Sequence, residues 1–534
     1  MRSIRSILAV VILTSGIAAC SSGRDRSNTL RVATDTEPAA LDPHLVTGYT
    51  EHRILVSLFE GLTTLDQKTL AVEPGAAESW TISADQLVYT FKIQPNARWS
   101  DGTPVTAHDF VYGWKRHLSP DLGSEYSYML WCLKNAQAYN EGKITEFNEV
   151  GVKALDDKTL EVTLAYPAPY FLSMQIHYAF FPVLKSNIEK FGKIDDRNSK
   201  WTLAGNMVSN GPFKLVEWKP NQIMRVERNE HYWDAADVRL DGIEFYPTEN
   251  LLTEERMFRS GKVHLIETLL ATKIDAYRKE NPNVLRIEPF IGVYFYRFNT
   301  TRPPLDDPRV RRALAMAIDR QSICDSVMYG AATPAVALTP PNLAGYTAKA
   351  HIDYNVEEAR RLLAEAGYSD GKGMRPIEIL YNESEDHKRI AEAIQDMWKK
   401  NLNVDVTTNQ QEWKVYLNSM TALNYDVVRS AWIADFLDPI NYTECFVTGG
   451  GNNRTGWSSP EYDALVEKAR YCIDPAERYE LLQQAEAIFL DGAPIAPIYV
   501  YKQKFLVSPE LKGLDANPLG YLNYRHFSLA GPRP

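Results

Sequence analysis

Apolar and polar residues alternate with a period of two in several short runs of the chain, which is the pattern of half-buried β-strands. One run begins at residue 29 with TLRVAT, and two more cover residues 86–93 (QLVYTFKI) and 159–166 (TLEVTLAY). Between these two, Thr106 is placed to cap a helix. A further β-rich stretch covers residues 211–233. We therefore expect many strands in the first half of the chain.

After residue 299 the pattern changes to helices with clear start signals. Three pairs, Asp307-Pro308, Ser459-Pro460 and Asp474-Pro475, each place a capping side chain before a proline at the first helical position. Residues 386–401 carry an apolar stripe at helical spacing, and the strand-like run NVDVTT follows them. This half predicts an α/β fold. No long linker separates the two halves, so lobes that share chain crossings are expected.

The length of 534 residues is too great for one ordinary core and predicts two to four lobes. The formal net charge is -10 at pH 7, and no basic footprint for nucleic acid is visible, so we expect no nucleic-acid partner. The chain holds 29 Tyr and 11 Trp, which suits either an aromatic-lined cavity or a large core.

The N-terminus predicts an exported protein. Arg2 and Arg5 precede a short apolar run, which is typical of a signal peptide over residues 1–19. Ile17-Ala18-Ala19-Cys20 follows this run and resembles the lipobox of bacterial lipoproteins. We therefore expect lipidation of Cys20 and a membrane anchor followed by a polar tether, residues 20–28. An ordinary signal peptide with a soluble product is the alternative.

The other four cysteines give no metal motif. They show no CxxC or zinc-like spacing, and the chain has no HExxH, so we expect neither a metal site nor a cofactor. In an oxidising compartment one or two disulfides are permitted, and their pairing stays open. These cysteines are Cys132, Cys324, Cys445 and Cys472.

Catalytic motifs are also weak, so we expect a protein that is not an enzyme. GWSSP lacks the second glycine of a nucleophile elbow, and its Ser459 is better used as a helix cap. The run from Gly449 to Gly451 is not followed by Lys-Ser/Thr, which favours a flexible surface loop over a phosphate site. Asp438 precedes Pro439, which favours turn chemistry over acid-base work.

One stretch, RSAWIADFLDP at residues 429–439, raises a question about charge. It follows the apolar run YDVV, and an isolated carboxylate at such a place is costly unless it faces water or meets a cation. Three partners are open for Asp435: Arg429 itself, a catalytic group, or a positive group on a ligand.

Four segments together resemble, in the same order, the extracytoplasmic solute-binding proteins of family 5, which serve peptide ABC transporters. The resemblance extends over essentially the whole chain after the predicted signal peptide. The segments are residues 77–116, 209–220, 298–320 and 429–439.

The resemblance implies an α/β, periplasmic-binding-protein-like fold, the Venus flytrap of type II or cluster C, with three lobes. The lobes would be residues 29–63, 206–292 and 515–534 for lobe I, residues 64–205 for lobe II, and residues 293–514 for lobe III. A peptide would be enclosed between them on hinge closure and held as an added β-strand. It also implies a monomer that delivers peptides to an inner-membrane ABC permease complex.

The resemblance further implies the site residues. Asp435 matches the aspartate that pairs with the α-amino group of the peptide, and Arg429 matches an arginine that helps to receive its carboxylate. Local pairing of Asp435 with Arg429 stays open as the alternative. The other positions that match ligand-contact or cleft positions of the family are His387, Trp413, Trp432, Tyr126 and Glu51.

Two departures from the family leave the ligand open. Met420 stands where a second arginine would receive a carboxylate, and Ile433 stands at a family disulfide cysteine. A narrower range of peptide lengths is therefore expected. Other ligands of the family stay open, namely a murein peptide, a dipeptide, or a nickel or haem complex, and an exported peptidase is the alternative from another class.

Overall fold

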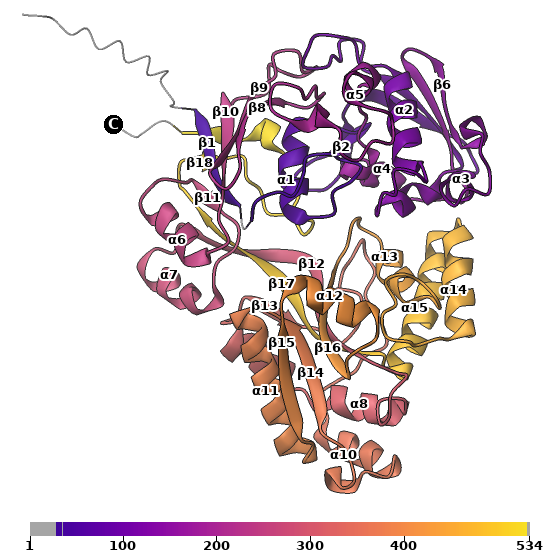
Figure 1. Ribbon diagram of the computed structural model, residues 1–534. Helices are drawn as coiled ribbons and strands as arrows, with labels where there is room; N and C mark the ends of the chain where they lie inside the picture. Colours follow the sequence, from indigo (N-terminus) through magenta and orange to yellow (C-terminus); the bar gives the residue numbers. More distant parts are fainter. Residues whose placement is uncertain (1–27, 35, 531–534) are drawn as a thin grey trace, which may run out of the picture.

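The computed structural model describes residues 28–34 and 36–530. The predicted signal peptide and the predicted lipidation site at Cys20 lie outside the described residues. One sheet of eleven strands runs through the molecule (Figure 1). Its order is β15 (Val406–Gln411), β14 (Ile377–Asn382), β16 (Val427–Ile433), β12 (Leu285–Phe298), β17 (Ile495–Val507), β11 (Leu265–Ile266), β1 (Thr29–Thr34), β10 (Gly242–Pro247), β9 (Ile223–Arg228) and β8 (Phe213–Lys219), with β13 (Ala332–Pro334) beside β17.

The two long strands of this sheet connect the two halves of the molecule. β12 and β17 pair antiparallel from Leu285 with Leu506 to Arg297 with Ile495, with two register shifts on the way. Figure 1 shows them crossing the middle, between the half with α1, α2 and α4 and the half with α8, α10 and α14. The strand pairing therefore crosses from one half of the molecule to the other at these two strands.

A second sheet has four antiparallel strands and carries two of the predicted runs. β5 and β7 fall within residues 86–93 and 159–166, and Phe91 and Leu160 on them are fully buried, so the prediction of strands here is confirmed. The sheet order is β4 (Ala77–Ile82), β5 (Val88–Ile93), β7 (Thr159–Thr163) and β6 (Val152–Asp156). Two small sheets pair β2 (Thr63–Leu65) with β3 (Val72–Pro74) and β18 (Leu511–Lys512) with β19 (Ser528–Leu529).

The predicted helix starts are confirmed. The side chains of Asp307, Ser459 and Asp474 each accept a hydrogen bond from a backbone N–H in the first turn. The α-helices are α1 (Tyr49–Leu58), α2 (Ala107–Leu118), α3 (Ala136–Asn140), α4 (Phe171–Met174), α5 (Lys185–Phe191), α6 (Leu251–Arg259), α7 (Ile274–Glu280), α8 (Pro308–Met316), α9 (Arg320–Ser322), α10 (Val356–Glu365), α11 (Glu385–Leu402), α12 (Trp413–Thr421), α13 (Ile440–Thr443), α14 (Pro460–Tyr471) and α15 (Pro475–Gly492).

The helix α11 shows how the apolar stripe becomes a packed face. Ile390, Ile394 and Trp398 recur at a spacing of four residues, so they lie on one side of the helix, and all three are fully buried. The Trp398 indole N–H donates to the Leu314 carbonyl at 2.8 Å, which satisfies the one polar atom on this face. Hydrophobic spacing thus fixes which side of α11 meets the core.

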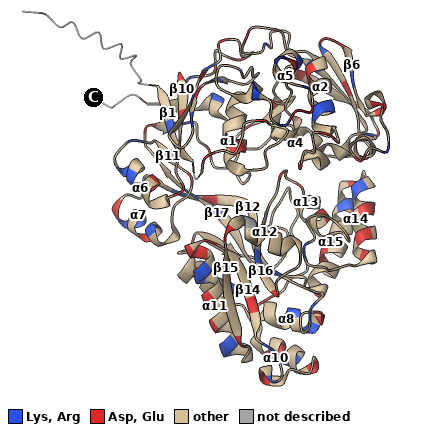
Figure 2. Cartoon of the chain, in the orientation of Figure 1, with Lys and Arg blue, Asp and Glu red and all other residues tan. Residues whose placement is uncertain are grey.

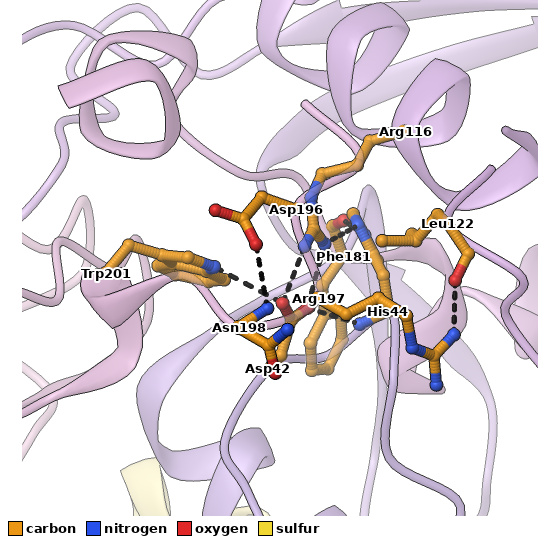
Figure 3. A network of polar contacts seen from close by, with 9 residues as sticks. All are labelled: Asp42, His44, Arg116, Leu122, Phe181, Asp196, Arg197, Asn198 and Trp201. Carbon is orange, nitrogen blue, oxygen red and sulfur yellow. Dashed lines mark hydrogen bonds and ion pairs between the residues drawn. The ribbon is translucent and has the colours of Figure 1, made fainter. Parts of the chain in front are cut away.

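A buried ion pair joins the loop before α1 to α2 (Figure 3). The Arg116 guanidinium donates to both carboxylate oxygens of Asp42, at 2.8 and 2.6 Å, and to Nδ1 of His44 at 3.0 Å. The Trp201 indole N–H also donates to Asp42, at 3.2 Å. Because every partner is buried, this network stabilises one arrangement of the loop against the helix.

A second buried ion pair corrects the interpretation of Asp438. Its carboxylate does accept the turn hydrogen bond from the Ile440 N–H at 2.9 Å, as expected before Pro439. It also pairs with Arg478 of α15 at 2.7 and 2.9 Å, and both side chains are buried. Turn chemistry alone was therefore an incomplete account of this residue.

Charged residues of both signs are interspersed on the outer helices, as Figure 2 shows for α11 and α14. None of the helices within residues 28–34 and 36–530 has both the length and the apolar character needed to cross a lipid bilayer.

Candidate functional site

A cavity of about 1000 Å³ lies between residues 125–174 and residues 432–471. Its volume is at the upper end of the range for small-ligand sites. One wall comes from the 3-10 helix η1 (Ser127–Cys132) and its neighbours, and the other from the end of β16 and from α13 and α14. Aromatic side chains line both walls: Tyr126, Tyr128, Trp131, Tyr166, Tyr170, Trp432, Phe436 and Tyr471.

The two walls touch each other through aromatic rings. The rings of Tyr170 and Phe436 stack with centroids 4.3 Å apart, and those of Tyr166 and Tyr471 meet edge to face at 5.6 Å. Such pairs add attraction beyond the area they bury. The described conformation therefore has its two walls in contact on this side of the cavity.

Asn441 of α13 fixes two site residues at once. Its side-chain oxygen accepts a hydrogen bond from the Trp432 indole N–H at 2.9 Å and from the Asp435 backbone N–H at 3.2 Å. The Trp432 ring therefore lies against the cavity in a defined orientation. The same contact holds the backbone of Asp435 beside it.

The Asp435 carboxyl makes no ion pair with any residue in the described part of the chain. The charged group with the largest effect on it is another acid, Glu444, which lines the cavity. Burial first and Glu444 second raise the pKa of Asp435 to about 7, while hydrogen bonds from Asn441 and Tyr128 oppose the rise. A half-buried acid beside another acid, with no cation among the described residues, is the arrangement that a positively charged ligand group would complete.

Tyr126 lies across from Asp435 on the other wall. Its ring contacts His177 at 5.0 Å and Tyr128 at 5.6 Å. Burial raises the pKa of Tyr126, and the Asp435 carboxylate adds to the rise, so the two side chains lie within electrostatic reach. Of the predicted site residues, Tyr126 and Trp432 thus line the cavity, and Asp435 lies beside it, tied to Trp432 through Asn441.

Arg429 lies on β16 among tyrosine side chains. Its guanidinium donates to the Tyr501 hydroxyl at 3.0 Å and to the Asn382 side chain at 3.3 Å, and its centre lies 4.9 Å from the centroid of the Tyr294 ring. Its Nε atom is buried without a hydrogen-bond partner in the described residues. The predicted alternative, an Arg429–Asp435 ion pair, is wrong for the described conformation, in which Asp435 pairs with no described cation.

His387 shares the Tyr294 ring with Arg429. The imidazole lies 5.6 Å from that ring, and its Nδ1 is 3.5 Å from the Tyr294 hydroxyl. Burial first, then Arg429 and Lys504, lower the pKa of His387 to about 2. The imidazole is therefore neutral in the described conformation and would meet a ligand there without a positive charge.

Trp413 is connected to Arg429 through Tyr416. It is 50% exposed and stacks on Tyr416 with centroids 5.5 Å apart. The Tyr416 hydroxyl in turn donates to the Arg429 carbonyl. We name this set, Arg429, His387, Tyr294, Tyr416 and Trp413, the arginine-tyrosine cluster.

Two residues that the sequence placed at the ligand site, Glu51 and Met420, do not line the cavity. Glu51 is buried at the start of α1, and its carboxylate accepts a hydrogen bond from the Ala39 N–H at 2.7 Å. It holds the preceding loop and does not line the cavity. Met420 is 5% exposed and packs in an apolar cluster with Leu380 and Tyr425, so it is not the wall of a ligand site.

The described residues show neither a disulfide nor a metal cluster. Cys132, Cys324, Cys445 and Cys472 are all free thiols, and Cys132 and Cys445 line the cavity from opposite walls. No group of three or more His, Cys, Asp or Glu side chains in residues 28–34 and 36–530 is arranged to hold a metal ion.

Several cavity residues were not found from the sequence. Glu444 and Asn441 come from α13 and the turn after it, and Arg454 comes from the loop after the glycine run. That loop is at the surface as expected, but its Gly450 and Gly451 also line the cavity. The glycines of this loop were the only local sign in the sequence that it borders a cavity, since a residue without a side chain leaves room beside a ligand.

Comparison with known proteins identifies the family. Residues 71–454 match the model of the bacterial extracellular solute-binding proteins, family 5 (middle). The oligopeptide-binding protein OppA of Bacillus subtilis is 37% identical over 97% of this chain and 98% of its own length. The periplasmic oligopeptide-binding protein OppA of Salmonella typhimurium is 36% identical over 95% of each chain.

Solved structures agree with the sequence relatives. The Escherichia coli murein tripeptide binding protein MppA gives a TM-score of 0.84 at 35% identity, covering 94% of this chain and 98% of that one. Its unliganded open form gives 0.76 at 35% identity, covering 94% and 97%. Haemophilus influenzae OppA in complex with RPPGFSPFR gives 0.82 at 33% identity, covering 95% and 99%. The chain therefore belongs to the bacterial extracellular solute-binding proteins of family 5, which are transport binding proteins and not enzymes.

Proposed function

We propose that this chain is the substrate-binding lipoprotein of a peptide ABC importer and captures oligopeptides through their backbone and their termini. The three lobes have the boundaries predicted above, and the cavity lies between lobes II and III. β12 and β17 are the crossings about which the lobes close on a peptide. The TM-score is 0.76 to the unliganded open form of MppA and 0.82 to Haemophilus influenzae OppA in complex with RPPGFSPFR, which supports a closed state for the conformation described here.

The observation that carries this proposal is the Asp435 carboxyl. It is half-buried beside an aromatic cavity, lies near the acid Glu444, and pairs with no cation of the described residues. The α-ammonium group of a peptide supplies the missing charge, and Trp432 and Tyr126 enclose the first residues of the peptide. Backbone hydrogen bonds along the peptide then give affinity that is independent of its sequence.

The arginine-tyrosine cluster is the proposed carboxylate end. The orphan Nε of Arg429 and the neighbouring Tyr294 hydroxyl are donors that a carboxylate can accept from. Glu51 is left out of the proposed site because its carboxylate already holds the loop before α1. Cys20 anchors the protein to the membrane on the periplasmic side of the cell envelope, where it acts as a monomer and delivers its ligand to the permease.

Mass spectrometry of the co-purified ligand tests the proposal. Protein purified without denaturation is unfolded, and the released small molecules are identified. Intact peptides with free amino termini are expected, and the Asp435→Asn variant, purified in parallel, carries far fewer. Recovery of a metal or haem complex instead would favour another ligand of the family. Cleavage of an added peptide pool would favour a peptidase.

A further inference from the structure

Three cationic side chains line the cavity, and only one of them lacks an acidic partner among the described residues. Lys143 pairs with Glu141 at 2.5 Å, and Arg470 lies 3.6 Å from Glu444 and 3.6 Å from Glu467. The third cation, Arg454, makes no ion pair and no side-chain hydrogen bond within the described chain, and its Nε is buried without a partner. A buried guanidinium donor left unsatisfied is costly unless something supplies an acceptor.

The loop around Arg454 does not need this side chain for its shape. The Asn453 side chain donates to the carbonyls of Phe446 at 3.1 Å and Trp457 at 2.8 Å. Thr455 on the other side accepts from the Trp457 N–H at 3.1 Å and donates to Asn453 at 2.7 Å. The neighbours of Arg454 thus hold the loop, and the arginine is left to face the cavity.

A second arginine, Arg297, adds positive charge beside the loop that carries Arg454. Arg297 of β12 is 4% exposed, donates to the Asn452 carbonyl at 2.7 Å, and lies over the Phe446 ring at 5.1 Å. It also has no acidic partner in the described residues; burial lowers the pKa of Arg297, and the Arg454 guanidinium adds to the lowering. The two guanidinium groups therefore repel each other, and neither makes an ion pair with a described carboxylate.

A short chain of contacts links Arg297 to the proposed amine anchor. The Asp435 backbone N–H donates to the Asn441 side chain at 3.2 Å, and the buried Cys445 thiol, which lines the cavity, donates to the Asn441 carbonyl at 3.1 Å. Phe446, the next residue, lies under the Arg297 guanidinium. A strand advances about 3.3 Å per residue, so a peptide anchored at Asp435 would bring its first residues to the part of the cavity that Arg454 lines. An acid there would be met by Arg454 in a charge-assisted pair.

We propose that Arg454, supported by Arg297, forms a subsite of the cavity for the carboxylate of an acidic side chain at one of the first two residues of the bound peptide. This inference rests on the proposed peptide-binding function. The carboxy terminus of a short peptide has the same chemistry, and the experiment separates the two sources.

Calorimetry at pH 8 with matched tripeptides tests the subsite. Native protein is titrated with Ala-Ala-Ala, with Glu-Ala-Ala against Gln-Ala-Ala, and with Ala-Glu-Ala against Ala-Gln-Ala. In one of the two pairs the Glu peptide should bind about tenfold more tightly than its Gln counterpart, since a hydrogen bond to a charged group has about this effect. Arg454→Gln should reduce that ratio to about one, and Arg454→Lys should retain part of it.

Two controls show that the variant is folded and that the effect is local. Arg454→Gln should bind Ala-Ala-Ala within about twofold of native protein, because that peptide has no acid for the subsite. Arg256→Gln removes one exposed positive charge on α6, outside the cavity lining, and should leave the Glu to Gln ratio as in native protein.

Three results would overturn the subsite. Equal affinities for both Glu and Gln pairs in native protein would do so, and so would a Glu preference that survives Arg454→Gln. The third is a loss of affinity on amidation of Ala-Ala-Ala that is present in native protein and absent in Arg454→Gln, because Arg454 would then receive the carboxy terminus. Failure of native protein to bind any of these peptides would instead count against the proposed function.

Discussion

Asp435 follows Arg429 by six residues, yet the two side chains form no ion pair. The Arg429 guanidinium donates to Asn382 and Tyr501, while the Asp435 carboxyl faces Tyr128 and the acid Glu444. An ion pair between Arg429 and Asp435 would have compensated both charges within one segment of the chain. Its absence leaves each charge without a partner of opposite sign, which is unfavourable away from water. The separation leaves an acid and a base that each lack an ion-pair partner among the described residues, and a zwitterionic peptide carries the complementary pair of charges.

The first prediction concerns Asp435→Asn and peptide affinity. Truncating one member of a buried charge pair costs about 2 to 5 kcal/mol, so the variant should bind alanine peptides about thirty-fold more weakly or worse. N-acetylation of the peptide should cause a similar loss in native protein and little further loss in the variant. Calorimetry measures all four affinities, and equal binding of free and acetylated peptide to native protein would contradict the assignment.

The same variant gives a second prediction, on stability without ligand. Because the pKa of Asp435 is raised to about 7 in the folded protein, ionisation of this group opposes folding. Its contribution is most favourable below the unfolded pKa, near 4, and is lost as the pH rises through 7. Ligand-free Asp435→Asn should therefore unfold at a higher temperature than native protein at pH 8, and the difference should shrink toward pH 4.

Thermal denaturation at several pH values checks this behaviour. A structural aspartate would give the opposite result, because replacing it would lower the unfolding temperature at pH 8. A gain in stability together with a loss of binding is the signature of a residue kept for function.

The third prediction is the pH dependence of binding in native protein. An ammonium group requires the ionised form of Asp435, so affinity should fall by about 50-fold from pH 7 to pH 5 as the carboxyl becomes protonated. Glu444 is the second cause of the raised pKa of Asp435. Glu444→Gln should therefore move this fall to lower pH, and Asp435→Asn should abolish it. A flat profile in native protein would mean that Asp435 does not titrate on binding.

Much of the fold followed from local signals. The caps at Asp307, Ser459 and Asp474 were correct because each depends only on a side chain and its own first turn. The alternating runs in β5 and β7 were correct because burial of one face requires that period. The lobe boundaries rested on the family resemblance and stay predictions.

The site was predicted less completely because its geometry depends on distant packing. Tyr170 meets Phe436, and Arg478 meets Asp438, only after the chain has folded. No periodicity marks Arg454, which is in a loop whose neighbours are turn residues. Sequence matching also placed Met420 at a ligand site, whereas the packing of α12 buries it in the core.

The fourth prediction concerns the membrane anchor. If Cys20 carries the lipid, Cys20→Ala removes the site of every acyl chain. Since stable anchoring depends on those chains, the variant should be exported and should appear in the soluble fraction. Fractionation followed by immunoblotting measures the distribution, with native protein as the membrane-bound reference. Retention of Cys20→Ala in the membrane fraction would place the anchor elsewhere in the chain.

The last prediction concerns the carboxylate end and the length of the peptide. Each added residue moves the carboxy terminus by about 3.3 Å, so only one length, or two adjacent ones, can bring it to Arg429. For that length, amidation of the carboxy terminus should weaken binding to native protein by about tenfold or more, since it removes a charge-assisted pair. In Arg429→Gln the amidated and free forms should bind alike. Calorimetry on alanine peptides from two to six residues gives the profile.

Met420→Arg provides the contrast to this experiment. Family resemblance alone predicts that a second arginine would broaden the range of lengths, but Met420 is buried against Tyr416 and Leu380 and does not line the aromatic cavity. A guanidinium there has no acid to pair with and should lower the unfolding temperature by several degrees without adding a preferred length. A broadened length profile in a stable Met420→Arg protein would show instead that α12 turns this position toward the peptide when the lobes move, and the carboxylate end would then need both positions.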